Sequence, residues 1–153
     1  MTRYLASGEW EPRDTIATLA SAMDVGNPSN MERLRSLIGD ANALRDHVAA
    51  WSIDDPSIED STRWMHQRTG MAICPHTATA IGAWRQMGRS DERWIAVATA
   101  HPAKFETIVE PLIGRDVEVP STLQGLLERP SRAADMKPND DAFHAALLAA
   151  FSE

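Results

Sequence analysis

Apolar residues recur every three or four positions through most of the chain, which is the spacing of amphipathic helices. This pattern predicts helices over residues 29–38, 42–50, 57–69, 76–87 and 102–113, a short helix from Ser121 and a last helix from about Asn139. Residues typical of helix ends support several of these boundaries. Ser29 and Glu32 have the spacing of a capping box, and Gly39, Gly70 and Gly114 each follow a predicted helix as a stop signal.

Short apolar runs between the helices predict strands. The clearest covers residues 94–98 and is apolar throughout, as expected for a strand whose two faces are both covered. Weaker candidates lie at residues 15–19, 51–53 and 71–74, with an edge strand at residues 133–137. Strands that alternate with helices favour an α/β fold, with a small parallel sheet and flanking helices. We expect Ile95 and Val97 to be buried, and Thr99 to lie at the carboxyl end of the strand, where open α/β sheets contact ligands.

The length and composition indicate a single domain over residues 1–153. With 153 residues and 43% hydrophobic content, the chain is long enough for one core. We expect an extended lead-in and loop over residues 1–27, followed by an α/β core and a C-terminal helix over residues 28–153.

The formal net charge of −7 gives no basic surface for nucleic acid or for an anionic membrane. No apolar run approaches the ~20 residues of a membrane span, and the first residues lack the apolar stretch of a signal peptide. Cys74 is the one cysteine, so neither an internal disulfide nor a cysteine zinc site is expected. These features predict a cytoplasmic protein that binds neither nucleic acid nor membrane.

A polar loop over residues 22–30 leads directly into the first predicted helix. Asn27, Ser29 and Asn30 lie where backbone N–H groups and the helix dipole favour an anion. Spacing alone favours a simpler interpretation, in which Ser29 caps the helix and Asn27 forms a turn with Pro28. Thr99 also has two interpretations, a ligand contact or a hydrogen bond to the backbone near the next helix.

Cys74 and His76 offer two metal ligands, but no further cluster accompanies them, so we predict no metal site. The other histidines share no common spacing, and we expect His101 to be a structural hydrogen-bonding residue. The five tryptophans are interpreted as core or contact residues rather than as a platform for nucleobases, because the chain is acidic.

Three ordered blocks resemble threonine synthase, a pyridoxal-phosphate (PLP) enzyme of the tryptophan-synthase-β fold type (fold type II). The blocks cover residues 7–30, residues 70–82 with Pro-His-Thr-Ala at 75–78, and the sequence Thr-Ala-His-Pro-Ala-Lys-Phe at 99–105. The resemblance runs from about Ser7 to Asn139 and corresponds to the C-terminal portion of the family. One departure is Cys74, which stands where the family usually carries an acidic residue.

The resemblance implies conversion of O-phospho-L-homoserine and water to L-threonine and phosphate, with PLP as cofactor. It implies that Thr99 contacts the pyridine nitrogen of PLP. It also implies that Asn27, Ser29 and Asn30 help to shape the pocket for the substrate.

The family's early motifs are absent from this sequence. The resemblance implies a Schiff-base lysine and a glycine-rich phosphate loop, but the lysines here are Lys104 and Lys137 in other contexts, and the closest glycines are Gly82 and Gly88. We therefore expect no catalytic residue in this chain, no covalently bound PLP, and activity only with an N-terminal threonine synthase-like partner polypeptide. The alternative is a non-catalytic remnant or interaction module that retains the fold. In either case we expect a homo-oligomer.

Overall fold

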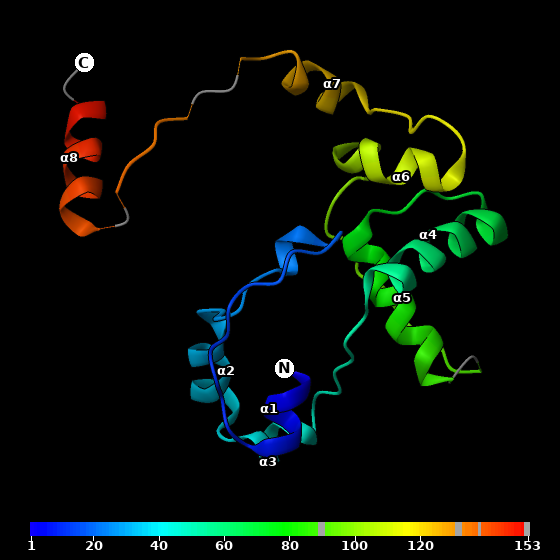
Figure 1. The fold of residues 1–153 in the computed structure, drawn as a ribbon, viewed down its shortest axis with the longest axis horizontal. Helices are drawn as coiled ribbons and strands as arrows, with labels where there is room; N and C mark the ends of the chain where they lie inside the picture. The colour runs from blue at the N-terminus through cyan, green and yellow to red at the C-terminus, as the bar shows by residue number, and fades with distance from the viewer. Residues whose placement is uncertain (89–90, 131–132, 138, 152–153) are drawn as a thin grey trace. The chain divides into compact units, whose positions relative to one another are not determined.

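The computed structural model describes residues 1–88, 91–130, 133–137 and 139–151 (Figure 1). The chain forms two compact units, Met1–Glu118 and Val119–Glu153, and each is described by itself. Within the described ranges, all regular secondary structure is helical.

The first unit begins with a group of short helices. They are α1 (Thr2–Ser7), the 3-10 helix η1 (Ser21–Met23), α2 (Asn30–Ile38) and α3 (Ala41–Arg45). Helix α1 packs against α3. The buried core of this group consists of Tyr4, Met31, Ala41 and Leu44. The indole of Trp10 covers it and lies edge-on to Tyr4, with ring centroids 6.1 Å apart.

Helix α1 lies where the sequence pattern predicted an extended lead-in, so that prediction is wrong for residues 2–7. Tyr4 is 4% exposed, and the backbone N–H of Gly8 donates to the carbonyl of Tyr4 at the end of the helix. A helix of six residues is too short to be stable alone in water. Burial of Tyr4 therefore stabilises α1 more than its own helix propensity does.

A second group of helices follows in the same unit. It contains α4 (Asp55–Thr69), α5 (Pro75–Met87), the 3-10 helix η2 (Pro102–Phe105) and α6 (Glu106–Ile113). Helix α4 packs on both α5 and α6, and η1 contacts α5. The core of this group consists of Ala20, Ile58, Ile73, Ala78 and Ile81. Since Ala20 belongs to this core, the segment before the polar loop is fixed to α4 and α5.

Most of the predicted helices are confirmed, with small shifts at their ends. Gly70 and Gly114 adopt left-handed φ angles of 75° and 70° directly after α4 and α6, where a glycine end signal was predicted. The prediction of a capping box at the start of α2 is wrong, because the Ser29 side chain makes no capping hydrogen bond. Helix α4 begins earlier than predicted, because the Asp54 carboxylate caps it by accepting from the Ser57 backbone N–H at 3.0 Å.

The predicted parallel sheet is wrong: none of the residues that the structure describes forms a strand. The candidate segments 15–19, 51–53, 71–74, 94–98 and 133–137 are all irregular. A strand needs a neighbouring strand for its backbone hydrogen bonds, and no backbone hydrogen bond links residues 94–98 to other described residues. Ile95 and Val97 are 92% and 69% exposed, so their predicted burial is also wrong.

The second unit contains α7 (Ser121–Leu127) and α8 (Asp140–Ala150). The side-chain oxygen Oδ1 of Asn139 caps α8 by accepting from the Ala142 backbone N–H at 2.8 Å, and the helix begins where the sequence predicted. Neither helix has a buried residue. Across both units, no helix in the described part of the chain is long and apolar enough to cross a membrane.

Candidate functional site

The polar loop runs beside an earlier segment of the chain. The backbone N–H of Arg13 donates to the Gly26 carbonyl at 3.2 Å, and the Gly26 N–H donates to the Thr15 hydroxyl at 3.4 Å. A Cβ atom at position 26 would lie 1.9 Å from the Arg13 carbonyl oxygen. Only glycine allows this approach of the two backbones.

Asp24 and Asp55 fix the start of the loop. The two carboxylate oxygens of Asp24 accept from the backbone N–H and the hydroxyl of Thr18, each at 2.7 Å. The Leu19 N–H donates to the Asp55 carboxylate at 3.0 Å, which connects this segment to the first turn of α4. The position of the loop therefore depends on α4.

His76 connects the loop to α5. Its Nε2 accepts from the Ala22 backbone N–H at 3.0 Å, and its ring lies 4.9 Å from that of Phe105. The side chain is buried, and Nδ1 has no hydrogen-bond partner among the described residues. Because Nε2 acts as an acceptor, a neutral His76 carries its proton on Nδ1. Sequence reasoning placed His76 at a helix start but did not identify this contact.

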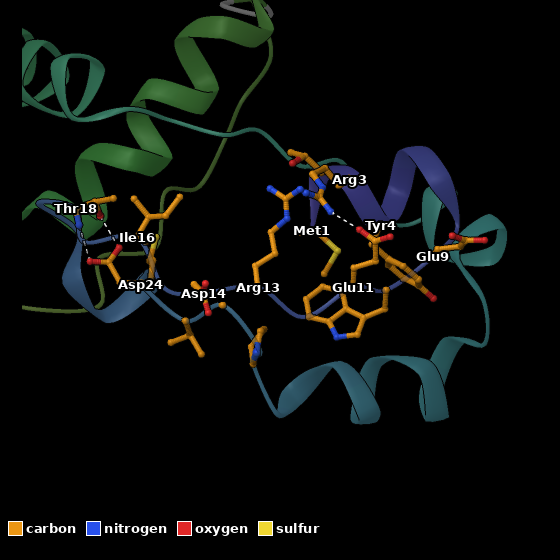
Figure 2. A pocket seen from close by; sticks show the side chains of 16 residues that line it. Met1, Arg3, Tyr4, Glu9, Glu11, Arg13, Asp14, Ile16, Thr18 and Asp24 are labelled. Carbon is orange, nitrogen blue, oxygen red and sulfur yellow. Dashed lines mark hydrogen bonds and ion pairs between the residues drawn. The ribbon is translucent and has the colours of Figure 1, made fainter.

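Two cavities border the loop. The first, of about 440 Å³, contains Arg13, Asp24 and Gly26 in its lining, and Figure 2 shows the Asp24 carboxylate hydrogen-bonded to Thr18 at its edge. The second, of about 550 Å³, is lined in part by Ser29 and Asn30. The two predicted substrate contacts are therefore exposed side chains at a cavity.

Asn27, the third predicted substrate contact, lines neither of these cavities. Its side-chain amide oxygen, Oδ1, accepts from the indole N–H of Trp10 at 3.3 Å. This bond joins the loop to the core of α1, α2 and α3, which is a structural role. The sequence-based assignment of Asn27 to substrate binding stays a prediction.

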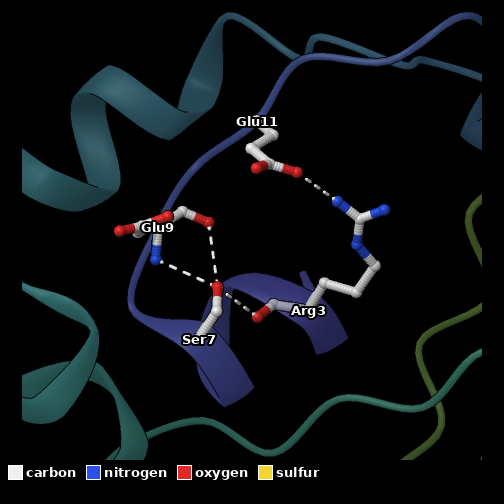
Figure 3. A network of polar contacts seen from close by, with 4 residues as sticks. All are labelled: Arg3, Ser7, Glu9 and Glu11. Atoms are coloured by element: carbon white, nitrogen blue, oxygen red, sulfur yellow. Dashed lines mark hydrogen bonds and ion pairs between the residues drawn. The ribbon is translucent and has the colours of Figure 1, made fainter.

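The first cavity carries both signs of charge. Arg3 pairs with Glu11 at 2.8 Å on the exposed surface, and the Ser7 hydroxyl, which donates to the carbonyls of Arg3 and Glu9, orders the turn between them (Figure 3). Arg13 also lines this cavity and makes no ion pair with another described residue. Arg13 is thus a candidate anion contact. The sequence feature that could have identified Arg13 is its position within residues 7–30, the first of the three blocks that resemble threonine synthase.

Thr99 lines neither of the cavities at this loop. It is exposed in the irregular segment before η2. The cap of η2 is His101, whose Nδ1 accepts from the Ala103 backbone N–H at 3.2 Å. Thr99 therefore shares no cavity with Ser29 and Asn30, and its contact with PLP stays a prediction.

Cys74 is buried at the start of α5, with its sulfur 3.3 Å from the Thr77 hydroxyl. It makes no capping hydrogen bond to the helix backbone. Among the residues that the structure describes, no group of three or more histidine, cysteine or acidic side chains could hold a metal ion.

Sequence comparison identifies relatives that are named threonine synthase. Residues 77–147 match the family model described as threonine synthase, C-terminal. Threonine synthase of Haemophilus influenzae is 34% identical over 146 residues, which cover 95% of this chain and 34% of that protein. Threonine synthase of Serratia marcescens is 34% identical over 128 residues, covering 84% of this chain and 30% of that protein. The chain therefore spans about a third of the length of these relatives.

The fold agrees with this similarity. The crystal structure of threonine synthase from Escherichia coli aligns with 97% of this chain and 34% of that chain, with a TM-score of 0.80 and 27% identity. A structure described as PLP-bound threonine synthase from Brucella melitensis aligns with 84% of this chain and 33% of that chain at a TM-score of 0.72 and 24% identity, which supports the fold. Sequence and fold together show that this chain is homologous to the C-terminal portion of threonine synthases.

Proposed function

We propose that this chain supplies the C-terminal portion of a threonine synthase, which converts O-phospho-L-homoserine and water to L-threonine and phosphate with PLP. The observation that carries the proposal is the alignment of 97% of the chain with a threonine synthase structure at a TM-score of 0.80. The proposed location is the cytoplasm.

In this proposal the loop at α2 binds the phosphorylated substrate. Ser29 and Asn30 line a cavity, and no side chain caps the helix, although the Met31 N–H donates to the Pro28 carbonyl at 3.2 Å. In this proposal the other N–H groups of the first turn bind the anion. Arg13 adds a positive charge beside the same loop. Asn27 and its bond to Trp10 hold the loop in place.

In this proposal the described residues supply only part of a PLP site. Gly70, Gly88 and Gly114 each end a helix, so they form no loop that could cradle a phosphate. Lys104 is exposed within η2, outside any motif typical of a PLP-tethering lysine. We assign to this chain one PLP contact, the Thr99 hydroxyl, and we assign the tethering lysine and the phosphate loop to the part of a threonine synthase that precedes the region matched here. That part is called the N-terminal portion below.

Reconstitution tests the proposal. The full chain is mixed with the N-terminal portion of the Haemophilus influenzae enzyme, and release of phosphate from O-phospho-L-homoserine is measured with PLP present. We expect turnover only in the mixture. A second arm uses a single chain in which this sequence replaces the matched region of that enzyme, so that weak association does not prevent a result. Inactivity of a folded, PLP-loaded single chain would reject the proposal.

A matched pair of variants tests the assigned contact. Thr99→Val removes the hydroxyl at nearly constant volume, whereas Thr99→Ser retains it. We expect Thr99→Val to lower the turnover number and Thr99→Ser to retain most of it. Equal turnover numbers for the two variants would show that the Thr99 hydroxyl is not a contact of the site.

The second candidate function is an interaction module without catalysis. Large exposed apolar side chains favour it, including those of Ile95, Val97 and Phe151. A stable complex with the N-terminal portion that has no turnover would support this alternative. DNA immediately upstream of the reading frame provides an independent check, because the proposed enzyme needs a sequence that encodes the missing lysine and glycine motifs.

A further inference from the structure

We propose that residues 93–99, together with the groove between them and helices α4 and α5, form the docking surface for the N-terminal portion of a threonine synthase. This inference rests on the proposed function, which requires that portion, and it identifies the residues that hold it. We call this surface the docking face.

The apolar residues of the docking face are exposed in this chain. Trp94, Ile95 and Val97 are 47%, 92% and 69% exposed. Trp94, Ile95 and Val97 all line the groove described below. A run that is apolar throughout is typical of a segment that is covered on both sides. Nothing in the described part of the chain covers Ile95.

The backbone of the same segment is also available. None of the backbone hydrogen bonds between described residues involves residues 93–99. Such groups bond to water when exposed, but they need protein partners when buried. A polypeptide that covers Ile95 and Val97 would therefore have to bond this backbone as well, which adds directional contacts to the apolar ones.

A groove of about 440 Å³ continues the docking face toward α4 and α5. Its apolar lining includes Trp64, Ile81, Trp84, Met87, Trp94 and Val97. The indoles of Trp64 and Trp84 lie 5.9 Å apart, and the guanidinium groups of Arg68 and Arg85 lie 5.6 and 5.1 Å from the Trp64 ring. Trp64 and Trp84 are partly buried, and tryptophan and arginine are both enriched at the centres of protein interfaces.

The length of the relatives indicates what occupies the docking face. This chain accounts for 34% of the Haemophilus influenzae protein and 34% of the Escherichia coli chain, so about two thirds of each lies outside the matched region. That portion is large enough to cover the segment and the groove together. A second copy of this chain is a poorer occupant, because two chains of net charge −7 repel each other.

Binding of the N-terminal portion of the Haemophilus influenzae enzyme tests the inference. Its affinity for the full chain is measured by calorimetry, with circular dichroism as the check on folding. Ile95→Asp and Val97→Asp should each weaken binding by about tenfold or more, which is the order expected for losing one buried aliphatic side chain. Leu37→Asp is the matched control, because Leu37 on α2 is 75% exposed and lies outside the docking face. It should change the affinity less than about twofold.

The outcomes separate this inference from the proposed function. Equal weakening by all three variants, or by none, would overturn the docking face. Self-association that Ile95→Asp abolishes, with no binding of the N-terminal portion, would assign the face to a second copy and would also overturn the inference. Binding that depends on Ile95 and Val97 without any turnover would support the docking face and reject the enzymatic function.

Discussion

Nε2 of His76 accepts a hydrogen bond from the backbone N–H of Ala22 at 3.0 Å, and this contact attaches the polar loop to the first turn of α5. The two residues are 54 positions apart in the sequence. His76 also lies against Phe105, so one buried ring connects the loop, α5 and η2.

The contact predicts different effects for two substitutions. His76→Leu fills the space but leaves the Ala22 N–H without its acceptor, which should destabilise the first unit by about 1–3 kcal/mol. His76→Gln offers a carbonyl oxygen near the position of Nε2 and should retain more of that stability. Denaturant unfolding gives the free energies, and hydrogen exchange at the Ala22 amide reports the bond directly. Equal exchange protection in both variants would contradict this role.

Gly26 should not accept a side chain. Gly26→Ala would place Cβ 1.9 Å from the Arg13 carbonyl, so the two segments must separate, at a cost of about 1–3 kcal/mol. Gly125→Ala is the control, because a Cβ at that α7 position meets nothing within 4 Å. There alanine should be neutral or should stabilise the helix by up to about 1 kcal/mol. Thermal unfolding of both variants compares the two positions, and a neutral Gly26→Ala would refute the close approach.

The cap of α4 predicts a dependence of stability on acid pH. Hydrogen bonds from the Ser57 side chain and backbone N–H hold the pKa of Asp54 below its ordinary value of 3.8. A carboxyl group whose pKa is lower in the folded state stabilises the fold above the unfolded value, and this contribution is lost as pH falls through the lower, folded value. The contribution of Asp54 should therefore be present above about pH 3.8 and should be lost progressively as pH falls from there through the lower, folded pKa.

Asp54→Asn tests this assignment, because asparagine also caps helices but does not titrate in this range. The midpoint of thermal unfolding is measured from about pH 2 to about pH 6, an interval that spans the usual pKa values of carboxyl groups. The difference between the variant and the unchanged chain should vary below about pH 3.8 and be constant above it. A difference that is constant at every pH would show that Asp54 is not the group responsible.

The isolated chain should not bind PLP covalently. Lys104 and Lys137 are its lysines, and neither stands in a motif typical of PLP attachment. Absorption spectra with PLP should lack the band of lysine-bound cofactor. A band that Lys104→Ala or Lys137→Ala removes would contradict this prediction and locate the tether.

Without an N-terminal portion the chain should self-associate. Exposed apolar side chains on the docking face favour association, whereas the net charge of −7 opposes it. Added salt screens the charge, so association should increase with ionic strength. Sedimentation velocity at low and high salt measures this effect, and a monomer at high concentration in both conditions would contradict the prediction.

The sequence predicted most helices correctly, because the apolar spacing and the end residues that specify a helix are close together along the chain. The apolar spacing and the end glycine identified α4 and α6, although the Ser29 capping box did not form. The sheet prediction failed for a physical reason. The run at residues 94–98 shows that this segment is suited to burial, but a strand also depends on a neighbour, and the described residues supply none.

The same distinction, between features encoded locally and contacts that join distant residues, applies to the candidate site. Sequence position alone placed Ser29 and Asn30 at the start of a helix, and the structure adds a cavity beside them. The bond from Ala22 to His76 and the approach of Arg13 to Gly26 join distant parts of the chain. No local spacing encodes such contacts, so one sequence read alone could not reveal them.

The pairing of α4 with α5 has a consequence for the order of folding. These helices are neighbours in sequence, joined only by residues 70–74, so their contacts close a short length of chain and can form early. The bonds from Leu19 to Asp55 and from Ala22 to His76 close much longer lengths of chain, so we expect them to form after that pair. The polar loop would then acquire its final shape late, on a surface that the two helices have already formed.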